Sequence, residues 1–342
     1  MKGIQSPAII ERMTDDASNA NPGSDAQSAI QAGAMTQRSE ADAHVLAALA
    51  DKPATMPPKL FYDKLGSTLF TAICELDEYY PTRTEAAIFA AHGKAIGEAL
   101  PRGFQMVDLG AGDCRKAAGL FADLRPAGYV AVDISGEFLE QAVGTLSQAN
   151  PDLPMRALAR DFTHEWTLPD ELRDAGLLYF YPGSSIGNFD ATEAVQFLQR
   201  LPRSRAGHTD LLIGFDRVKA RSVLEAAYDD ALGVTGAFNR NALLVANQTL
   251  GTDFQLPNWQ HRAFFNEKLK RIEMHLVAQQ ACVVTWAGGQ REFAAGESIH
   301  TESSHKYDVD AFTGLLDAAG FEVSGHWHDA NEWYSVVLAR AR

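Results

Sequence analysis

The hydrophobic and polar positions of the 342-residue chain follow a strand-and-helix rhythm between Phe104 and Asp216. Short apolar runs typical of buried strands lie within residues 105–112, 128–135, 155–162, 176–189 and 209–216. Segments with the 3.6-residue spacing of helices lie between them, at residues 115–124, 136–149 and 191–201. This alternation predicts an open, mostly parallel sheet with helices on both faces.

The pattern differs on either side of that region. Residues 66–80 carry apolar positions at helical spacing, and Thr82 and Glu85 have the spacing of a capping box before an alanine-rich helix. After Asp216 the pattern predicts helices at 220–230, 237–250 and 308–320, and strands within 270–288, 291–304, 321–329 and 332–340. We therefore predict an inserted second unit that interrupts the α/β domain before its final helix and strands.

Composition and charge narrow the function classes. The chain has 44 acidic and 30 basic side chains, a net charge of −14, and this balance disfavours nucleic acid or an anionic membrane as partner. No run of 18 apolar residues predicts a membrane span, and the first residues do not resemble a signal peptide. We expect a cytoplasmic, monomeric enzyme that acts on a small molecule. Residues 1–40 show little apolar periodicity and are predicted to form a disordered tail.

The three cysteines, Cys74, Cys114 and Cys282, lie far apart in the sequence and lack CxxC spacing. A disulfide framework or a structural zinc site is therefore not expected. We predict free thiols in a reducing compartment.

The stretch "VDLGAGD" ends one predicted strand with an acid and turns on Gly110 and Gly112. Glycines allow close backbone approach to a ligand, but the third glycine of a dinucleotide fingerprint is replaced by Arg115. Asp133 ends the next strand, where a carboxylate can accept hydrogen bonds from ribose hydroxyls, and Asp161 and Phe162 follow the third. This series resembles the cofactor site of S-adenosylmethionine-dependent methyltransferases.

Five longer strings extend the resemblance over residues 57–342: "FYDKLGSTLFTAICELDEYYPTRTE", "GSSIGNF", "AYDDALGVTGAFNRN", "RIEMHL" and "HTESSHKYD". In this order they are similar to the ergothioneine-pathway L-histidine Nα-methyltransferase family. The resemblance implies an α/β fold with a Rossmann-like class I methyltransferase domain at 83–221 and 309–342. It also implies an inserted α+β substrate-binding domain at 41–82 and 222–308. The implied reaction uses S-adenosylmethionine, without a metal, to trimethylate L-histidine to hercynine, the first step of ergothioneine biosynthesis.

The resemblance also implies site residues, position by position. The residues implied to contact the cofactor are Gly110, Lys116, Asp133, Asp161 and Phe162. The residues implied to surround the bound amino acid are Tyr62, Tyr79, Asn188, Tyr228 and Met274, with Glu302 and Ser304 as readers of the imidazole. Asp108 and Ala111 stand where the family often has Glu and Ser, a mild departure.

These residue types suit methyl transfer, which needs an aligned neutral amine more than covalent help. A free α-amino group titrates at about pH 8, so a dedicated strong base is not required. Tyr62, Asn188 and Tyr228 are the predicted catalytic residues, and Asn188 and Tyr228 can orient the amine and carboxylate without adding charge beside the sulfonium. A neutral imidazole offers one donor and one acceptor nitrogen, which match Glu302 and Ser304, two positions apart on a predicted strand.

Other interpretations remain open for several of these residues. His300 and His305 with Glu302 suggest a metal site, but their spacing is not HExxH and no further ligand cluster is evident in the sequence. Asn188 could cap the helix that follows, although Asp190 suits that position better.

Tyr79 and Met274 suit a plain core, Lys116 suits an exposed helix, and residues 296–308 suit a solvated turn. The alternative functions are methylation of another amino acid or a histidine derivative, and a non-catalytic protein that binds S-adenosylmethionine.

Overall fold

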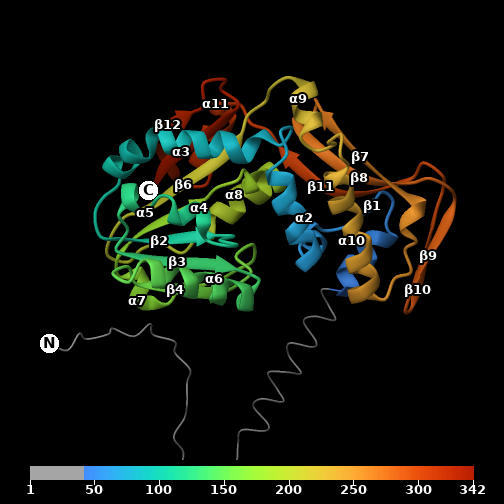
Figure 1. Ribbon diagram of the computed structural model, residues 1–342, viewed down its shortest axis with the longest axis horizontal. Coiled ribbons are helices and arrows are strands. Elements are labelled where there is room, and N and C mark those ends of the chain that lie inside the picture. Colours follow the sequence, from blue (N-terminus) through green and yellow to red (C-terminus); the bar gives the residue numbers. More distant parts are fainter. Residues whose placement is uncertain (1–41) are drawn as a thin grey trace, which may run out of the picture. The chain divides into compact units, whose positions relative to one another are not determined.

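A computed structural model describes residues 42–342 of the chain (Figure 1). The predicted tail at 1–40 lies outside the described residues. The chain divides into two compact units. The first contains the described residues up to Thr71, with Leu232–Arg262 and Met274–Glu302; the second contains Ala72–Ala231, Ala263–Glu273 and Ser303–Arg342. No helix within residues 42–342 is long and apolar enough to cross a membrane.

The second unit is built on a seven-stranded sheet of order β12-β13-β6-β5-β2-β3-β4. The five predicted strands form its parallel part, and β12 and β13 complete it in antiparallel orientation. The strands are β2 (Phe104–Leu109), β3 (Gly128–Asp133), β4 (Met155–Ala159), β5 (Gly176–Tyr181), β6 (Thr209–Asp216), β12 (Phe321–His328) and β13 (Tyr334–Ala341). The predicted mostly parallel α/β sheet is confirmed.

Helices cover both faces of this sheet (Figure 1). Along β2, Val107 and Leu109 enter one core cluster and Met106 enters the other, the two-residue period of a strand buried on both sides. The first cluster packs under α8 (Ala191–Gln199) and α11 (Val309–Ala318), and the second under α3 (Tyr80–Ala99) and α6 (Gly136–Ala149). The remaining helices of the unit are α4 (Arg115–Ala118), α5 (Phe121–Leu124), α7 (Asp170–Arg173), η2 (Ser185–Asn188) and α9 (Arg221–Ala226).

The first unit contains strands of a four-stranded sheet of order β1-β11-β8-β7 and the antiparallel pair β9–β10. Its strands are β1 (Ala54–Thr55), β7 (Trp259–Asn266), β8 (Arg271–Ala278), β9 (Cys282–Trp286), β10 (Gly289–Phe293) and β11 (Ser298–His305). Its helices are η1 (Pro58–Phe61), α2 (Lys64–Cys74), α10 (Val234–Leu250) and η3 (Leu256–Asn258). The ends of α2, β7, β8 and β11 belong to the second unit. The sequence pattern did not predict strands β1 and β7. Strand β1 has only two residues, and apolar and polar residues alternate only weakly along β7.

Two local predictions were wrong. Helix α3 begins at Tyr80 with Tyr79 as its N-cap, so Thr82 and Glu85 lie inside the helix and form no capping box. The Glu85 carboxylate instead accepts hydrogen bonds from distant groups in the buried interior. The single helix predicted at 115–124 is divided into α4 and α5 around Gly119, a residue of low helix propensity.

Candidate functional site

The glycine loop after β2 has the conformation that its sequence predicts. Gly110 and Gly112 have φ values of +73° and +51°, in the region where a side chain would be strained. The amides of Gly110 and Ala111 both donate to the Val132 carbonyl oxygen, at 2.9 and 3.2 Å. The loop is therefore fixed to the end of the neighbouring strand β3, with backbone exposed at the carboxyl edge of the sheet.

Asp133 holds the same loop through its side chain. Its Oδ2 accepts from the Gly112 amide at 3.1 Å, and its Oδ1 accepts from the Ser135 amide at 3.0 Å. An ionised carboxylate has about four acceptor positions, so two hydrogen bonds leave capacity for the hydroxyls of a ribose. The residue is half-buried at the end of β3, which suits a ligand that reaches it from the strand's carboxyl end.

Phe162 and Asp161 lie beyond the end of β4. The Phe162 ring lies near Gly110, where an added Cβ would be in ordinary van der Waals contact with its Cζ, at 3.7 Å. The ring also packs edge-on against Tyr181, with centroids 6.1 Å apart. Asp161 is exposed and accepts from Thr163. Partial burial would raise the pKa of Asp161, but the Thr163 hydrogen bonds and His164 lower it below its ordinary value. Gly110, Asp133 and Phe162 are thus brought together as predicted.

Lys116 is tied to a buried carboxylate that the sequence did not single out. Its ammonium lies 2.5 Å from Glu85 Oε2, with the Lys116 side chain 40% exposed and the Glu85 side chain fully buried. Glu85 Oε1 accepts from the Gly183 amide and the Tyr334 hydroxyl, each at 2.8 Å. Desolvation lowers the pKa of Lys116, but Glu85 outweighs it and raises the value overall. This ion pair fixes the lysine beside the loop that follows β5.

Asp108, the acid that precedes the glycine loop, is buried at 3% exposure. Its Oδ2 accepts from the Tyr129 hydroxyl at 2.7 Å. Burial raises the pKa of Asp108 to about 7, although the Tyr129 hydrogen bond pulls it down. A carboxyl group with this pKa is partly protonated at neutral pH.

A second polar centre lies where β6 ends and the segment after β11 passes beside it. The fully buried Lys306 ammonium donates to Asp216 Oδ2 at 2.8 Å, Ser304 Oγ at 2.9 Å and the Tyr228 hydroxyl at 3.0 Å. The Tyr228 and Ser304 hydroxyls are themselves 2.8 Å apart. Two predicted residues, Tyr228 and Ser304, therefore meet directly, beside a lysine that sequence reasoning missed.

Asp216 has two further partners. Tyr80 donates to its Oδ2 at 2.6 Å, and Lys219 lies 2.5 Å from its Oδ1. Burial alone would raise the pKa of Asp216, but Lys306 and Lys219 outweigh burial and hold the pKa below its usual range. Burial lowers the pKa of Lys219 to about 8, against the opposing effect of Asp216. The carboxylate thus stays charged at neutral pH, with both of its oxygens occupied.

The predicted aromatic residues occupy two settings. Tyr79 packs edge-on against Tyr228, with ring centroids 6.1 Å apart, in the second unit. Tyr62 belongs to the first unit, where its ring contacts Phe70 and Phe238 at 5.9 and 5.6 Å and stays 40% exposed.

Asn188 is exposed at the end of η2, in the second unit. Asp190 caps α8 in a capping box, so Asn188 has no capping role. Its neighbour Gly187 lies against His305, where an added Cβ would be 2.8 Å from the carbonyl oxygen. The glycine therefore allows the chain before Asn188 to approach the end of β11.

Met274 and Glu302 lie on the neighbouring strands β8 and β11. Met274 is buried at 2% exposure, and its carbonyl oxygen accepts from the Thr301 hydroxyl at 3.0 Å. Glu302 is half-buried, and its carbonyl oxygen pairs with His300 Nε2 at 2.9 Å. Their roles in reading an imidazole stay predictions.

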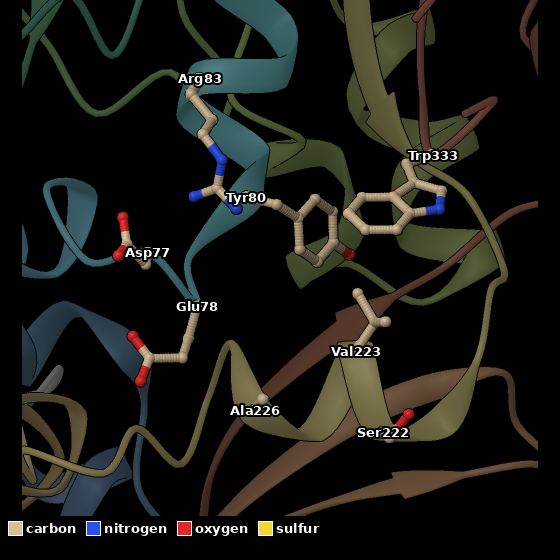
Figure 2. A pocket seen from close by; sticks show the side chains of 8 residues that line it. All are labelled: Asp77, Glu78, Tyr80, Arg83, Ser222, Val223, Ala226 and Trp333. Atoms are coloured by element: carbon tan, nitrogen blue, oxygen red, sulfur yellow. The ribbon is translucent and has the colours of Figure 1, made fainter. Parts of the chain in front are cut away.

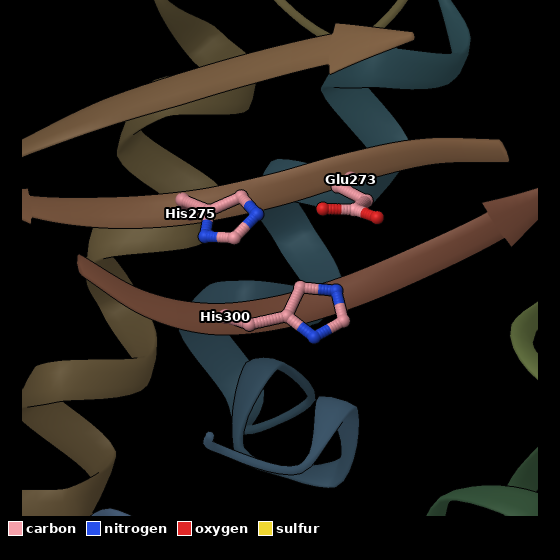
Figure 3. Close-up of side chains that lie close together, drawn as sticks. All are labelled: Glu273, His275 and His300. Atoms are coloured by element: carbon pink, nitrogen blue, oxygen red, sulfur yellow. The ribbon is translucent and has the colours of Figure 1, made fainter. Parts of the chain in front are cut away.

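Glu273, His275 and His300 form a group that the spacing of the sequence did not reveal (Figure 3). One potential ligand atom from each lies within 4.8 Å of the others, so the group could hold a metal ion. The Glu273 carboxylate already accepts from Asn266 at 3.0 Å and pairs with Arg271 at 2.8 Å, which neutralises its charge. His305 is not part of this group and bonds the Gly187 carbonyl through Nδ1. That the protein needs no metal stays a prediction.

A cavity of about 260 Å³ lies in the second unit, and Tyr80 is one of the residues that line it (Figure 2). Its lining includes the acids Asp77 and Glu78, with Arg83 and Trp333. None of the residues predicted for cofactor or substrate lines it. Tyr80 lines the cavity, and its hydroxyl donates to Asp216 of the polar centre.

Comparison with known proteins shows the family of the chain. A family model described as "Histidine-specific methyltransferase, SAM-dependent" matches residues 41–341. The chain belongs to this family. It is thus an S-adenosylmethionine-dependent methyltransferase, which confirms the resemblance seen in its sequence strings and excludes the non-catalytic alternative.

Three named proteins are similar in sequence to most of this chain. A histidine N-alpha-methyltransferase of Mycolicibacterium smegmatis is 37% identical over 86% of this chain and 93% of its own length. Ergothioneine biosynthesis protein 1 of Neurospora crassa is 29% identical over 85% of this chain, which spans 34% of that longer protein. An L-tryptophan methyltransferase of Psilocybe serbica is 25% identical over 84% of this chain and 88% of its own length.

Proposed function

We propose that this methyltransferase transfers methyl groups from S-adenosylmethionine to the α-amino nitrogen of L-histidine. Three transfers give hercynine, the first step of ergothioneine biosynthesis. The observation that carries the proposal is the match to a histidine-specific family over residues 41–341, supported by the histidine N-alpha-methyltransferase from Mycolicibacterium smegmatis. The proposed function also includes a cytoplasmic location, a monomeric state and no partner other than small molecules.

The glycine loop supports the cofactor part of the proposal. Gly110 leaves the backbone open beside the Phe162 ring, a setting that fits a flat adenine. Asp133 keeps acceptor capacity for ribose hydroxyls. Lys116, fixed by Glu85, suits the carboxylate of the cofactor's amino-acid end. When bound, the cofactor supplies a methyl group on a positively charged sulfur, and Asp161 adds an exposed negative charge beyond β4.

The substrate part of the proposal rests on residues that position the amino acid and do not activate its amine. A neutral amine attacks without a strong base, so the enzyme must align nitrogen, methyl carbon and sulfur. Asn188 and the tyrosines Tyr62, Tyr79 and Tyr228 are proposed to hold the amine and carboxylate through uncharged groups. Glu302 and Ser304 are proposed to read the imidazole, and Met274 to contribute an apolar wall. The burial of Ser304 beside Lys306 supports a role for its hydroxyl beyond solvation.

A substrate panel tests this function. The purified protein is incubated with methyl-labelled S-adenosylmethionine and each of the twenty amino acids, and products are detected by mass spectrometry. We expect mono-, di- and trimethylated histidine and no comparable product from the other amino acids. A protein that methylates none of them, or that prefers another amino acid, would contradict the proposal.

The second candidate is methylation of another amino acid, and one observation favours it. The relative from Psilocybe serbica is an L-tryptophan methyltransferase, so a similar chain is paired with an aromatic substrate. An indole has no acceptor nitrogen for a hydroxyl donor to meet. Preference for tryptophan over histidine in the same panel would establish this candidate and exclude an imidazole role for Ser304.

A further inference from the structure

The Glu85 carboxylate joins two loops of the second unit that carry predicted site residues. Its side chain is fully buried, and its two oxygens have different partners. Oε2 lies 2.5 Å from the Lys116 ammonium, which follows the glycine loop. Oε1 accepts from the Gly183 amide, in the loop after β5, and from the Tyr334 hydroxyl, each at 2.8 Å. One side chain of α3 thus holds the segments that follow β2 and β5.

All three partners of Glu85 are donors. An ammonium, a backbone amide and a tyrosine hydroxyl can each donate a hydrogen, and an ionised carboxylate only accepts. The Lys116 side chain is 40% exposed, so its ammonium can also reach a ligand from solvent. An added Cβ at Gly183 would lie 3.6 Å from the Lys116 Nζ, so the lysine and this turn also lie close to each other.

The β5 loop, residues 182–188, has a constrained backbone. Gly183 and Ser184 are consecutive residues with positive φ, at +80° and +59°. Glycine adopts such values freely, whereas for serine they are sparsely populated and must be imposed by the surroundings. The loop ends at Asn188, the residue proposed to hold the amine. The turn at Gly183 and Ser184 therefore sets the direction in which the chain reaches Asn188.

Two hydrogen bonds fix this turn from different sides. Glu85 of α3 accepts from the Gly183 amide, and Ser184 Oγ accepts from the Asp216 amide of β6 at 2.9 Å. Glu85 and Ser184 are 0% and 6% exposed, so water cannot readily replace either acceptor. The turn is thus attached to a helix on one side and to the end of a central strand on the other.

We infer that Glu85 and Ser184 are positioning residues for methyl transfer: Glu85 fixes Lys116 and the β5 loop to one carboxylate, and Ser184 fixes the turn that leads to Asn188. This inference rests on the proposed function, in which Lys116 contacts the cofactor and Asn188 the amine. Transfer needs nitrogen, methyl carbon and sulfur in line, and an error of about 1 Å costs on the order of a hundredfold in rate. Neither residue needs to touch a ligand for this role.

Two variants separate the two attachments. In Glu85→Gln the remaining oxygen can accept from the Gly183 amide and the Tyr334 hydroxyl, while the NH₂ group faces Lys116. We expect the dissociation constant of S-adenosylhomocysteine to rise by about five- to tenfold, with kcat at saturating cofactor within about threefold of wild type. Ser184→Ala should do the reverse, with kcat for histidine lowered by about ten- to a hundredfold and the dissociation constant within about twofold.

Two further variants are controls. Glu171→Gln makes the same substitution in an exposed pair, where Glu171 lies 2.7 Å from Arg156, and should change neither quantity. Ser184→Gly tolerates the positive φ but lacks the acceptor, so its kcat should fall with that of Ser184→Ala. Recovery of kcat in the glycine variant would overturn the role of the Ser184–Asp216 hydrogen bond.

The split between affinity and kcat is the result that a merely structural role would not produce. Equal changes of both quantities in Glu85→Gln and in Ser184→Ala would overturn the inference. If a variant fails to fold, as judged by thermal unfolding, amide hydrogen exchange of the wild type decides the question. The Gly183 amide should exchange at least about a hundredfold more slowly than in an unstructured peptide, and free exchange there would overturn the inference.

Turnover separates this inference from the proposed function. Absence of histidine methylation by the wild type would contradict the function itself. A histidine methyltransferase in which Glu85→Gln and Ser184→Ala fail to separate cofactor affinity from kcat would contradict only the positioning roles.

Discussion

Three buried carboxylates in the second unit differ in the number of ammonium partners that they have. Asp216 contacts two, Lys306 and Lys219, and Glu85 contacts Lys116. Asp108 instead bonds the uncharged hydroxyl of Tyr129. The pKa values of the two aspartates differ accordingly. The pKa of Asp216 lies below its usual range, and that of Asp108 is raised to about 7.

The comparison shows that burial alone does not decide whether a carboxylate is charged. Burial raises the pKa of both Asp108 and Asp216, and only the lysines beside Asp216 reverse the result. The charged centre lies beside the proposed substrate hydroxyls of Tyr228 and Ser304. The partly protonated carboxyl lies beside the glycine loop, whose Gly112 amide donates to the Asp133 side chain.

The largest expected effect follows removal of the carboxylate with two lysines. Asp216→Ala leaves Lys306 and Lys219 buried without their counter-charge and should lower the free energy of unfolding by about 3–5 kcal/mol. Urea denaturation at pH 7 measures the change. Asp317→Ala removes an exposed carboxylate paired with Arg342 and should cost about 1 kcal/mol or less. Similar losses in the two variants would show that the buried centre adds little.

The next effect concerns the carboxyl group whose pKa is raised. Folded Asp108 keeps its proton up to about pH 7, whereas the unfolded chain releases it near pH 4, so unfolding releases a proton between these values. This group therefore makes the wild-type protein lose stability, on the order of 3 kcal/mol, as pH rises from 4 to 7. Asp108→Asn should lose this part of the pH dependence in denaturant melts at several pH values. An unchanged slope would refute the raised pKa.

A smaller effect is expected at the carboxylate with one lysine. Glu85→Gln keeps groups that can bond Gly183 and Tyr334 but removes the charge that fixes Lys116. Because Lys116 is 40% exposed and can turn to water, we expect a loss of about 1–3 kcal/mol in unfolding free energy. Calorimetry with S-adenosylhomocysteine should also show weaker binding, since Lys116 is proposed to contact the cofactor. Loss of stability with unchanged affinity would restrict Glu85 to a structural role.

The smallest effect is expected where the charge pair is exposed. Lys270→Met removes a pair with Asp308 in which both side chains are more than half exposed, so stability should change by about 1 kcal/mol or less. Thermal unfolding measures it. A large loss would mean that this part of the chain depends on surface charge more than the buried centres suggest.

Much of the fold was predictable because the strands of the second unit are short apolar runs between helices with clear periodicity. The strand ends also placed Gly110, Asp133 and Phe162 at one edge of the sheet. The structure overturned the capping box because Glu85 bonds partners such as Tyr334, almost 250 residues away in the chain. Local spacing carries no information about such a partner.

The polar centre around Lys306 was missed for the same reason. Its lysine sits in a segment that reads as a solvated turn, and its counter-ion Asp216 looks like an ordinary strand end. The Lys306–Asp216 pair is buried because the segment after β11 lies beside the end of β6. This contact joins residues that are far apart in the sequence. Sequence strings identified the family and named Tyr228 and Ser304, but they did not indicate that one lysine joins them.

The most direct test of the proposed function is the position of the methyl groups on the product. Histidine labelled with ¹⁵N at its α-nitrogen is incubated with the enzyme and S-adenosylmethionine, and the product is fragmented in a mass spectrometer. The proposed function predicts a trimethylated product whose three methyl groups leave with the labelled nitrogen. Methyl groups on the ring nitrogens, or no methylated histidine at all, would contradict it.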